Sequence, residues 1–201
     1  MILILDYGLG NLGSIRNMLD HLNLECLISA DHKDLEKAEK LILPGVGSFD
    51  TAIERIQGTP GLKELLDHKA LVEKIPVLGI CLGMQLLTNG SEEGQLPGLG
   101  WIPAATKRFP ANGLKIPHMG WNLVRPTGDH PLTRGFADEI RFYFVHSYYV
   151  EVADPAHSLF KCHYGLDFDA AVGRDNIFGV QFHPEKSHRF GKQLLKNFGA
   201  L

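Results

Sequence analysis

The chain has 201 residues, of which 44% are hydrophobic and 21% are charged, a mixture typical of soluble globular proteins. Its 20 basic and 23 acidic side chains give a net charge of -3. This balance excludes a strongly basic surface for nucleic acid or an anionic membrane. At about 150 residues per domain, the length predicts one domain spanning residues 1–201.

The cysteines and the N-terminus indicate where the protein resides. Cys26, Cys81 and Cys162 are too few and too widely spaced for a disulfide framework, which favours a reducing compartment. The first residues have no basic segment before the apolar run, so no signal peptide is predicted. No apolar run approaches the roughly 18 residues that a membrane helix needs. We therefore expect a cytoplasmic protein.

Strands and helices alternate in the first half of the chain. Short apolar runs predict strands at residues 2–5, 24–28, 41–43 and 77–80. Apolar residues at helical spacing predict helices at residues 14–22, 49–57 and 62–69. This alternation predicts a parallel sheet with helices on both faces.

The second half has a different pattern. Connections rich in proline and glycine are expected around residues 94–131, followed by strands at residues 141–145, 158–162, 170–173 and 178–182. An amphipathic helix is predicted at residues 188–198. The predicted fold class is α/β: a central, mostly parallel sheet flanked by helices, with antiparallel strands added in the C-terminal half.

The first glycine-rich turn resembles a dinucleotide fingerprint. Gly8, Gly10 and Gly13 follow the first strand and open a helix, and Asp31 follows the second strand. In such a fingerprint the glycines admit a pyrophosphate and the acidic residue binds a ribose hydroxyl. A plain turn that needs positive φ angles would use the same residues. A nicotinamide-binding protein therefore remains a rival interpretation.

A second glycine-flanked turn carries a cysteine. Gly79-Ile80-Cys81-Leu82-Gly83 joins an apolar strand to a predicted helix, in the pattern of a nucleophile elbow. The helix N-terminus favours the thiolate of such a cysteine. A small buried core cysteine is the alternative. Cys26 and Cys162 have no such flanking glycines and are interpreted as packing residues.

A histidine and a carboxylate follow the last predicted strand. In His183-Pro184-Glu185 an extended chain would place the imidazole and the carboxylate on the same side, as a base and the group that orients it. A structural hydrogen bond is the alternative. His183, Glu185 and His188 lack the spacing of a known metal site, so no metal is predicted.

The loop Pro44-Gly45-Val46-Gly47 ends the third predicted strand. Functional loops of parallel sheets gather at the carboxyl ends of the strands, where Cys81 is also expected. Backbone N–H groups of Val46 and Gly47, together with that of Leu82, would form an oxyanion hole. An ordinary strand-to-helix turn is the alternative.

These motifs, in this order, resemble the class I glutamine amidotransferases over nearly the whole chain. The resemblance implies that Cys81 attacks the side-chain amide of glutamine, with His183 as the base and Glu185 as its orienting group. It implies no cofactor. By the same resemblance, the glutamine-binding residues are Gly47, Gln85, Ser147 and Tyr148.

Three further segments are similar to the glutaminase subunits of imidazole glycerol phosphate synthases. They are residues 6–11, 117–122 and 144–148. The resemblance implies a heterodimer with a separate (β/α)8-barrel cyclase, because a barrel needs about 250 residues, and a low basal activity that rises when the cyclase is liganded. The expected interface residues are Asn11, His118, Met119, Trp121 and Lys186. A glutaminase for another synthase, or a catalytically silent partner-binding subunit, would carry many of the same motifs.

Overall fold

The computed structural model describes residues 1–110, 113–136 and 139–201. The first half contains, in chain order, β1 (Ile2–Leu5), α1 (Leu12–His21), β2 (Cys26–Ser29), α2 (His32–Glu36), β3 (Lys40–Leu43), α3 (Phe49–Gly58), α4 (Leu62–Asp67), a π-helical turn (His68–Val72), β4 (Val77–Ile80) and α5 (Leu82–Leu86).

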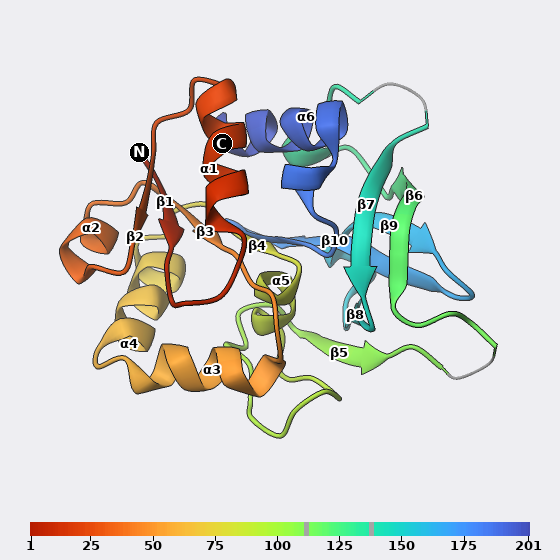
Figure 1. Ribbon diagram of the computed structural model, residues 1–201, viewed down its shortest axis with the longest axis horizontal. Coiled ribbons are helices and arrows are strands. Elements are labelled where there is room, and N and C mark those ends of the chain that lie inside the picture. Colours follow the sequence, from red (N-terminus) through yellow and green to blue (C-terminus); the bar gives the residue numbers. More distant parts are fainter. Residues whose placement is uncertain (111–112, 137–138) are drawn as a thin grey trace.

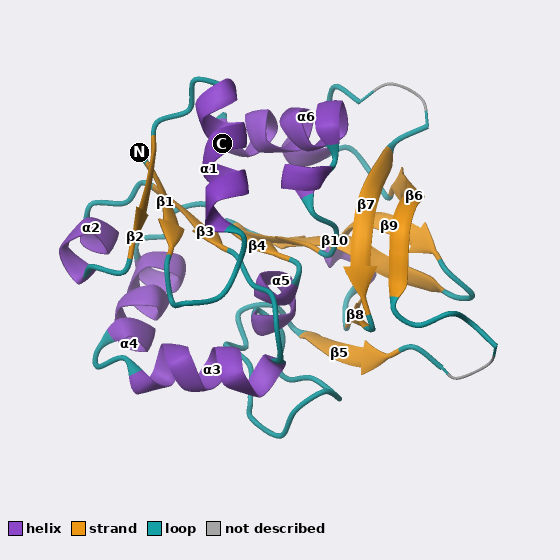
Figure 2. Ribbon diagram, in the orientation of Figure 1, coloured by secondary structure: helices purple, strands orange, loops and turns teal. Residues whose placement is uncertain are grey.

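The second half is built mainly from strands (Figure 2). It contains β5 (Ala104–Arg108), β6 (His118–Pro126), β7 (Arg141–His146), β8 (Tyr148–Val152), β9 (Ser158–His163), β10 (Asp167–Arg174), β11 (Ile177–Val180) and α6 (His188–Gly199), with short 3-10 turns at Pro131–Thr133, Pro155–His157 and Pro184–Lys186.

One sheet runs through the described residues. Its strand order is β2-β1-β3-β4-β11-β10-β9-β6-β7, and β5 joins it through β8, which pairs with β10. The strands β2, β1, β3, β4 and β11 are parallel, and the later pairs are antiparallel. The last strand, β11, therefore lies beside β4 and brings the residues that follow both strands to one edge of the sheet.

Each face of the parallel region has its own core. In β1, Ile2 and Ile4 pack with one set of buried residues, and Leu3 and Leu5 pack with the other, since successive side chains of a strand point to opposite faces. Helices α1 and α6 cover the first face, while α3 and α4 cover the second (Figure 1). The sheet is therefore fixed from both sides, as expected for a parallel sheet.

The fold class predicted from the sequence is confirmed, with differences in the second half. Residues 94–131 were expected to be connections, but they contain β5 and β6. Gly120 and Pro126 make β6 resemble a loop in sequence, although its buried and exposed residues largely alternate. Strand β8 was also not predicted. These strands depend on partners distant in the chain, which local composition does not reveal.

Two predicted elements end differently in the structure. The helix expected at residues 62–69 ends as α4 at Asp67 and continues as a π-helical turn. The strand expected at residues 178–182 ends at Val180. In the described part of the chain, every helix is too short or too polar to span a bilayer.

Candidate active site

Cys81 lies at the sharp turn between β4 and α5. Its backbone angles are φ 56° and ψ -110°, a conformation that costs energy and is found at functional sites. A Cβ on Gly79 would lie 2.6 Å from the Gly83 oxygen, and one on Gly83 would lie 1.8 Å from the Leu43 oxygen. The turn therefore requires both glycines. The N–H of Cys81 donates to the Val180 oxygen at 2.8 Å, which fixes the turn to β11.

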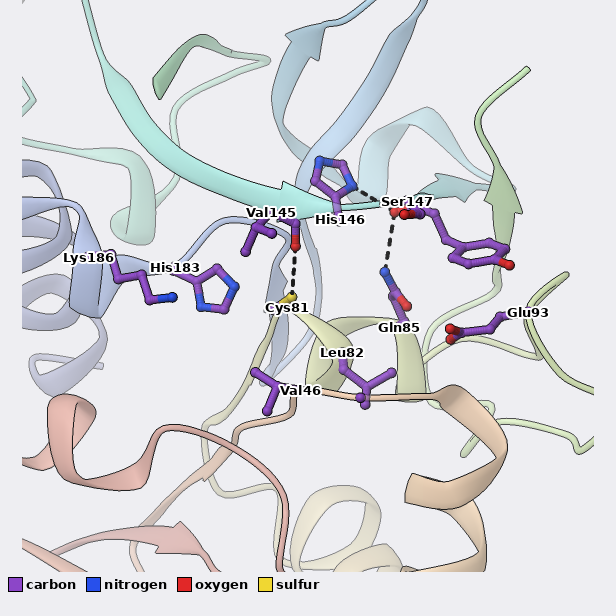
Figure 3. A pocket seen from close by; sticks show the side chains of 12 residues that line it. Val46, Cys81, Leu82, Gln85, Glu93, Val145, His146, Ser147, His183 and Lys186 are labelled. Carbon is purple, nitrogen blue, oxygen red and sulfur yellow. Dashed lines mark hydrogen bonds between the residues drawn. The ribbon is translucent and has the colours of Figure 1, made fainter. Parts of the chain in front are cut away.

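The sulfur of Cys81 faces three groups from the second half of the chain. It lies 3.9 Å from the Val145 oxygen, and the Gln181 amide donates to it at 3.8 Å. The ring of His183 lies beside it (Figure 3). Nε2 of His183 is buried and has no hydrogen-bond partner within the described residues, so it is available to exchange a proton with the sulfur or with a bound molecule.

Glu185 holds the other nitrogen of the imidazole. Nδ1 of His183 lies 2.7 Å from Oε1 of Glu185, and both side chains are buried. The sequence predicts an extended chain through His183 and Glu185. His183 is extended, with φ -98° and ψ 97°, but the chain does not stay extended as far as Glu185. Pro184 starts a 3-10 turn, which folds Glu185 back beside the ring.

The protonation of His183 reflects these contacts. Burial lowers the pKa of His183, but the nearby side chains of Cys81 and Glu185, which favour the charged ring, outweigh this effect and raise the pKa to about 10. At neutral pH His183 is therefore protonated on both ring nitrogens and positively charged. Such a group holds the proton of the cysteine–histidine pair and can deliver it to a leaving amine.

A cavity of about 310 Å³ opens above the sulfur, within the size range of small-molecule sites. It is lined by Val46, Gly47, Cys81, Leu82, Gln85, Glu93, Val145, His146, Ser147, Tyr148, His183 and Lys186. Every residue predicted for the oxyanion hole or for glutamine binding is in this set, as are Cys81 and His183. Glu185 is not in it and supports His183 from behind.

Glu93 and Gln181 were not singled out in the sequence. The carboxylate of Glu93 lies at the pocket wall and accepts the N–H of Phe49 at 2.9 Å. Burial raises the pKa of Glu93 despite this hydrogen bond. Gln181 is fully buried and accepts the amide of Gln85 at 3.1 Å. Only the fold brings these side chains to the site, and no local pattern marks them.

In the loop from Pro44 to Gly47, Val46 and Gly47 line the pocket, and Val46 lies across it from His146 (Figure 3). Gly47 has φ 117°, which favours glycine. The phenol of Tyr7 is buried and donates to the Pro44 oxygen at 2.5 Å. Burial, with a smaller contribution from Cys81, raises the pKa of Tyr7, so the phenol remains a donor and anchors the start of the loop.

Four of the five expected interface residues are exposed and one is not. Asn11, Met119, Trp121 and Lys186 are exposed, with Met119 at 60% and Trp121 at 45%. The side chain of His118 is buried. Its place among the interface residues is therefore corrected: it lies at the start of β6 with its side chain inward, whereas the side chains of Met119 and Trp121 point outward.

The glycine turn after β1 differs from a dinucleotide site. Arg55 fills the space beside Gly8 and donates to its oxygen at 2.7 Å, and the N–H of Gly8 is bound by Asp6. A Cβ on Gly13 would meet nothing within 4 Å, whereas the third glycine of the fingerprint is required for close helix packing. Among the residues that the structure describes, no group of three or more His, Cys, Asp or Glu side chains could hold a metal ion.

Comparisons with known proteins agree with this geometry. The family model "Glutamine amidotransferase class-I" matches residues 3–200. The chain belongs to the class I glutamine amidotransferase family.

Its relatives within that family narrow the assignment. The chain is 50% identical to imidazole glycerol phosphate synthase subunit HisH 2 of Pseudomonas aeruginosa, over 100% of both chains. It is 52% identical to subunit HisH 2 of Methanococcus maripaludis, over 98% of both chains. At this identity the chain is a member of the HisH subunits.

Solved structures with lower identity support the fold alone. A crystal structure titled glutamine amidotransferase has a TM-score of 0.77 at 18% identity, covering 100% of this chain and 99% of that one. The structure of PurLQS from Thermotoga maritima has a TM-score of 0.74 at 19% identity, covering 98% of this chain and 96% of that one.

Proposed function

We propose that this protein is the glutaminase subunit of an imidazole glycerol phosphate synthase. It hydrolyses L-glutamine to glutamate and ammonia and passes the ammonia to a cyclase subunit in histidine biosynthesis. The observation that carries the proposal is the position of Cys81 at the strained turn, beside a His183 that is bound to Glu185, on the floor of a pocket of about 310 Å³.

The chemistry follows from these three side chains. With the proton of the pair on His183, Cys81 attacks the amide carbon of glutamine as a thiolate. The tetrahedral intermediate collapses as His183 returns a proton to the departing nitrogen, so that ammonia leaves and a glutamyl thioester remains. Water then attacks the thioester with His183 as the base, and glutamate is released. Glu185 holds the ring in one tautomer throughout.

Backbone groups of the pocket are proposed to bind the oxyanion. The N–H of Leu82 follows the nucleophile at the start of α5, and the loop of Val46 and Gly47 borders the same pocket. Preorganised donors of this kind lower the barrier by about 3 kcal/mol each. The anchoring of Pro44 by Tyr7 limits the movement of this loop.

Polar groups at the other end of the pocket are proposed to hold the substrate. Gln85, Ser147 and Tyr148 line the pocket. The carboxylate of Glu93 lies at the wall of the same pocket and is suited to the α-ammonium group of glutamine. A substrate held at both ends presents its side-chain amide to Cys81 in a defined orientation.

The proposed partner is a separate (β/α)8-barrel cyclase in a heterodimer. It would use ammonia to form imidazole glycerol phosphate and aminoimidazole carboxamide ribotide. Free ammonia is largely protonated in neutral water and is then not nucleophilic, so transfer requires a closed route between the subunits. We assign Asn11, Met119, Trp121 and Lys186 to the interface, since exposed aromatic residues and methionine are enriched in such surfaces.

We further propose that residues 1–201 form one glutamine amidotransferase domain located in the cytoplasm. The match over residues 3–200 and the two cores on either face of one sheet support the single domain. All three cysteines are free thiols, which suits a reducing compartment.

The direct test replaces the nucleophile. In the complex with its cyclase, Cys81→Ala abolishes glutamine hydrolysis, while synthesis supplied with ammonium salts continues, because the cyclase needs only ammonia. Cys26→Ala, which removes a thiol far from the pocket residues in sequence and in the sheet, retains both activities. Loss of both activities in Cys81→Ala would mean that the cysteine is structural and would overturn the proposal.

Coupling to the partner is proposed to limit waste of glutamine. We expect the isolated chain to hydrolyse glutamine slowly and the complex to hydrolyse it faster once the cyclase holds its own ligand, with the amides of Val46 and Gly47 as the element that changes. Initial rates of glutamate release measure this ratio. Equal turnover in the isolated chain and in the liganded complex would contradict it.

A further inference from the structure

Two buried histidines lie at one wall of the pocket, and one of them, His146, lines it. His118 on β6 and His146 at the end of β7 face each other across the antiparallel pair, and Nδ1 of His118 lies 2.8 Å from Nε2 of His146. Their exposed fractions are 3% and 6%. Burial lowers the pKa of His118 to about 4 and that of His146 to about 3. Both rings are therefore neutral at pH 7.

The contacts at the two ends of the pair fix which nitrogen carries each proton. Nδ1 of His146 lies 2.7 Å from the backbone carbonyl oxygen of Tyr148. A carbonyl oxygen can only accept a hydrogen bond, so Nδ1 of His146 bears the proton. A neutral ring has one N–H, and Nε2 of His146 must then accept from Nδ1 of His118. The remaining nitrogen of His118 accepts from the Asn122 amide at 3.1 Å.

Asn122 is itself held in one orientation. Its Nδ2 also donates to the His163 oxygen at 3.0 Å, and its Oδ1 accepts the N–H of Leu123 at 2.8 Å. The hydrogen bonds therefore run in one direction, from Asn122 through His118 and His146 to the Tyr148 oxygen. Both histidines adopt the Nδ1–H tautomer, which is the less favoured neutral form of a histidine side chain in water.

Packing prevents the ring of His118 from turning out of these hydrogen bonds. It is stacked on Tyr164 at 4.0 Å and on Phe144 at 4.8 Å between ring centroids, with interplanar angles of 21° and 25°. Rings packed at this density keep their rotamers. The chain of donors is thus supported by packing as well as by its own hydrogen bonds.

This series of hydrogen bonds ends on the backbone carbonyl oxygen of Tyr148, which also accepts a hydrogen bond from Gln85, a pocket residue. The Tyr148 oxygen accepts the Gln85 amide at 3.3 Å in addition to His146 (Figure 3). Tyr148 and Ser147 line the cavity. The hydrogen-bond series begins at Asn122 on β6, whose outward residues Met119 and Trp121 are exposed. The two histidines thus connect an exposed strand to the substrate wall.

We propose that His118 and His146, as a neutral pair of Nδ1–H tautomers, are positioning residues that hold the Tyr148 carbonyl, and with it Gln85 and Ser147, in the geometry that binds glutamine. The inference rests on the proposed glutaminase function for its kinetic consequence. The hydrogen-bond direction does not depend on that function, and it can be measured separately.

The first experiment reads the tautomers in the unaltered protein. NMR of the chain labelled with ¹⁵N-histidine is expected to show Nδ1–H and unprotonated Nε2 for both rings at pH 7. An Nε2–H tautomer or a charged ring at either residue would overturn the inference, whatever the glutaminase assay shows. An absence of glutaminase activity with both Nδ1–H signals present would count against the proposed function alone.

The second experiment uses two variants of nearly equal shape. His118→Asn keeps an N–H that can reach Nε2 of His146, whereas His118→Leu removes it and leaves a similar gap. In the complex with the cyclase, the KM for glutamine is expected to rise about tenfold more in His118→Leu than in His118→Asn, with a much smaller change in kcat, as for one lost hydrogen bond in a buried site.

A purely structural role of the pair predicts a different result. The two variants would then share one KM, since both lose the same stacking on Tyr164 and Phe144. Equal KM values in two variants with the same thermal stability would therefore overturn the inference. If both variants fail to fold, the tautomers of the unaltered protein decide the question.

Discussion

Two turns of this molecule are alike in sequence but differ in what they do. Each joins a buried strand to a helix through glycines: one after β1, with Gly8 and Gly10, and one after β4, with Gly79 and Gly83. Beside Gly8 the space is filled by the flexible side chain of Arg55. At the second turn the neighbouring atoms are backbone atoms of other elements, which cannot move aside.

The difference shows what makes a glycine turn a site. After β4 the glycines let three backbone segments approach closely, and the residue between them is held at φ 56° with its sulfur toward the pocket. After β1 the turn is held by Asp6 within it and by the side chain of Arg55 from α3, which occupies the space beside Gly8. A glycine pattern therefore predicts chemistry only when a reactive side chain lies within it and when distant elements complete the pocket.

The largest expected effect is the loss of kcat on replacing His183, the side chain that faces Cys81 of the second turn. His183→Asn removes the base and is expected to lower kcat for glutamine by about 10³-fold, within the range for general acid–base catalysis. His21→Asn, on the helix that follows the first turn, is the matched control and is expected to leave kcat unchanged. Glutamate release in the complex measures both. A loss below tenfold for His183→Asn would contradict the assignment.

The next effect is on folding. Gly83→Ala places a methyl group against the Leu43 carbonyl and is expected to lower the free energy of unfolding by about 3 kcal/mol, the upper end for overpacking. Urea denaturation measures this change. A change below about 1 kcal/mol would show that the backbone at the second turn can adjust, and the contrast with the first turn would then fail.

A smaller effect depends on pH. The folded pKa of His183, about 10, lies above the value of about 6.5 in an unfolded chain. The folded state therefore binds more protons between these values, and the stabilisation from charged His183 is complete below pH 6.5 and is lost as pH rises toward 10. The stability difference between the unaltered protein and His183→Asn should shrink over this interval. A difference that grows with pH would contradict the charged state assigned to His183.

The smallest effect is at the first turn. Gly13 is exposed in α1, and a Cβ there would meet nothing within 4 Å. Gly13→Ala is expected to stabilise the protein by about 0.5 kcal/mol, because it restricts the unfolded chain, and to leave glutaminase activity unchanged. Thermal unfolding and the glutamate assay measure the two outcomes. A destabilisation would mean that this glycine has a contact that the described geometry lacks.

Local patterns were sufficient for the parts of the fold that short segments determine. Apolar runs marked β1 and β4 because strands buried on both faces contain little else. The glycines around Cys81 marked the turn because steric limits act over a few residues. The same local reasoning found His183 and Glu185, although a 3-10 turn and not an extended chain brings them together.

Patterns of this kind could not find what depends on contacts across the chain. The strands β5, β6 and β8 contain polar and turn-forming residues and are defined by their partners. Glu93 reaches the pocket only because its loop lies beside the start of α3. The resemblance placed His118 among the interface residues together with Met119 and Trp121, but the alternation of β6 turns it inward.

The central claim is that Cys81, rather than either other thiol, is presented to a glutamine-shaped ligand beside His183. A diazo-ketone analogue of glutamine tests this directly, because it alkylates a reactive thiol that binds it. Peptide mapping after reaction in the complex is expected to find the adduct on Cys81, with protection by excess glutamine. An adduct on Cys26 or Cys162, or labelling of Cys81 that glutamine does not reduce, would contradict the account.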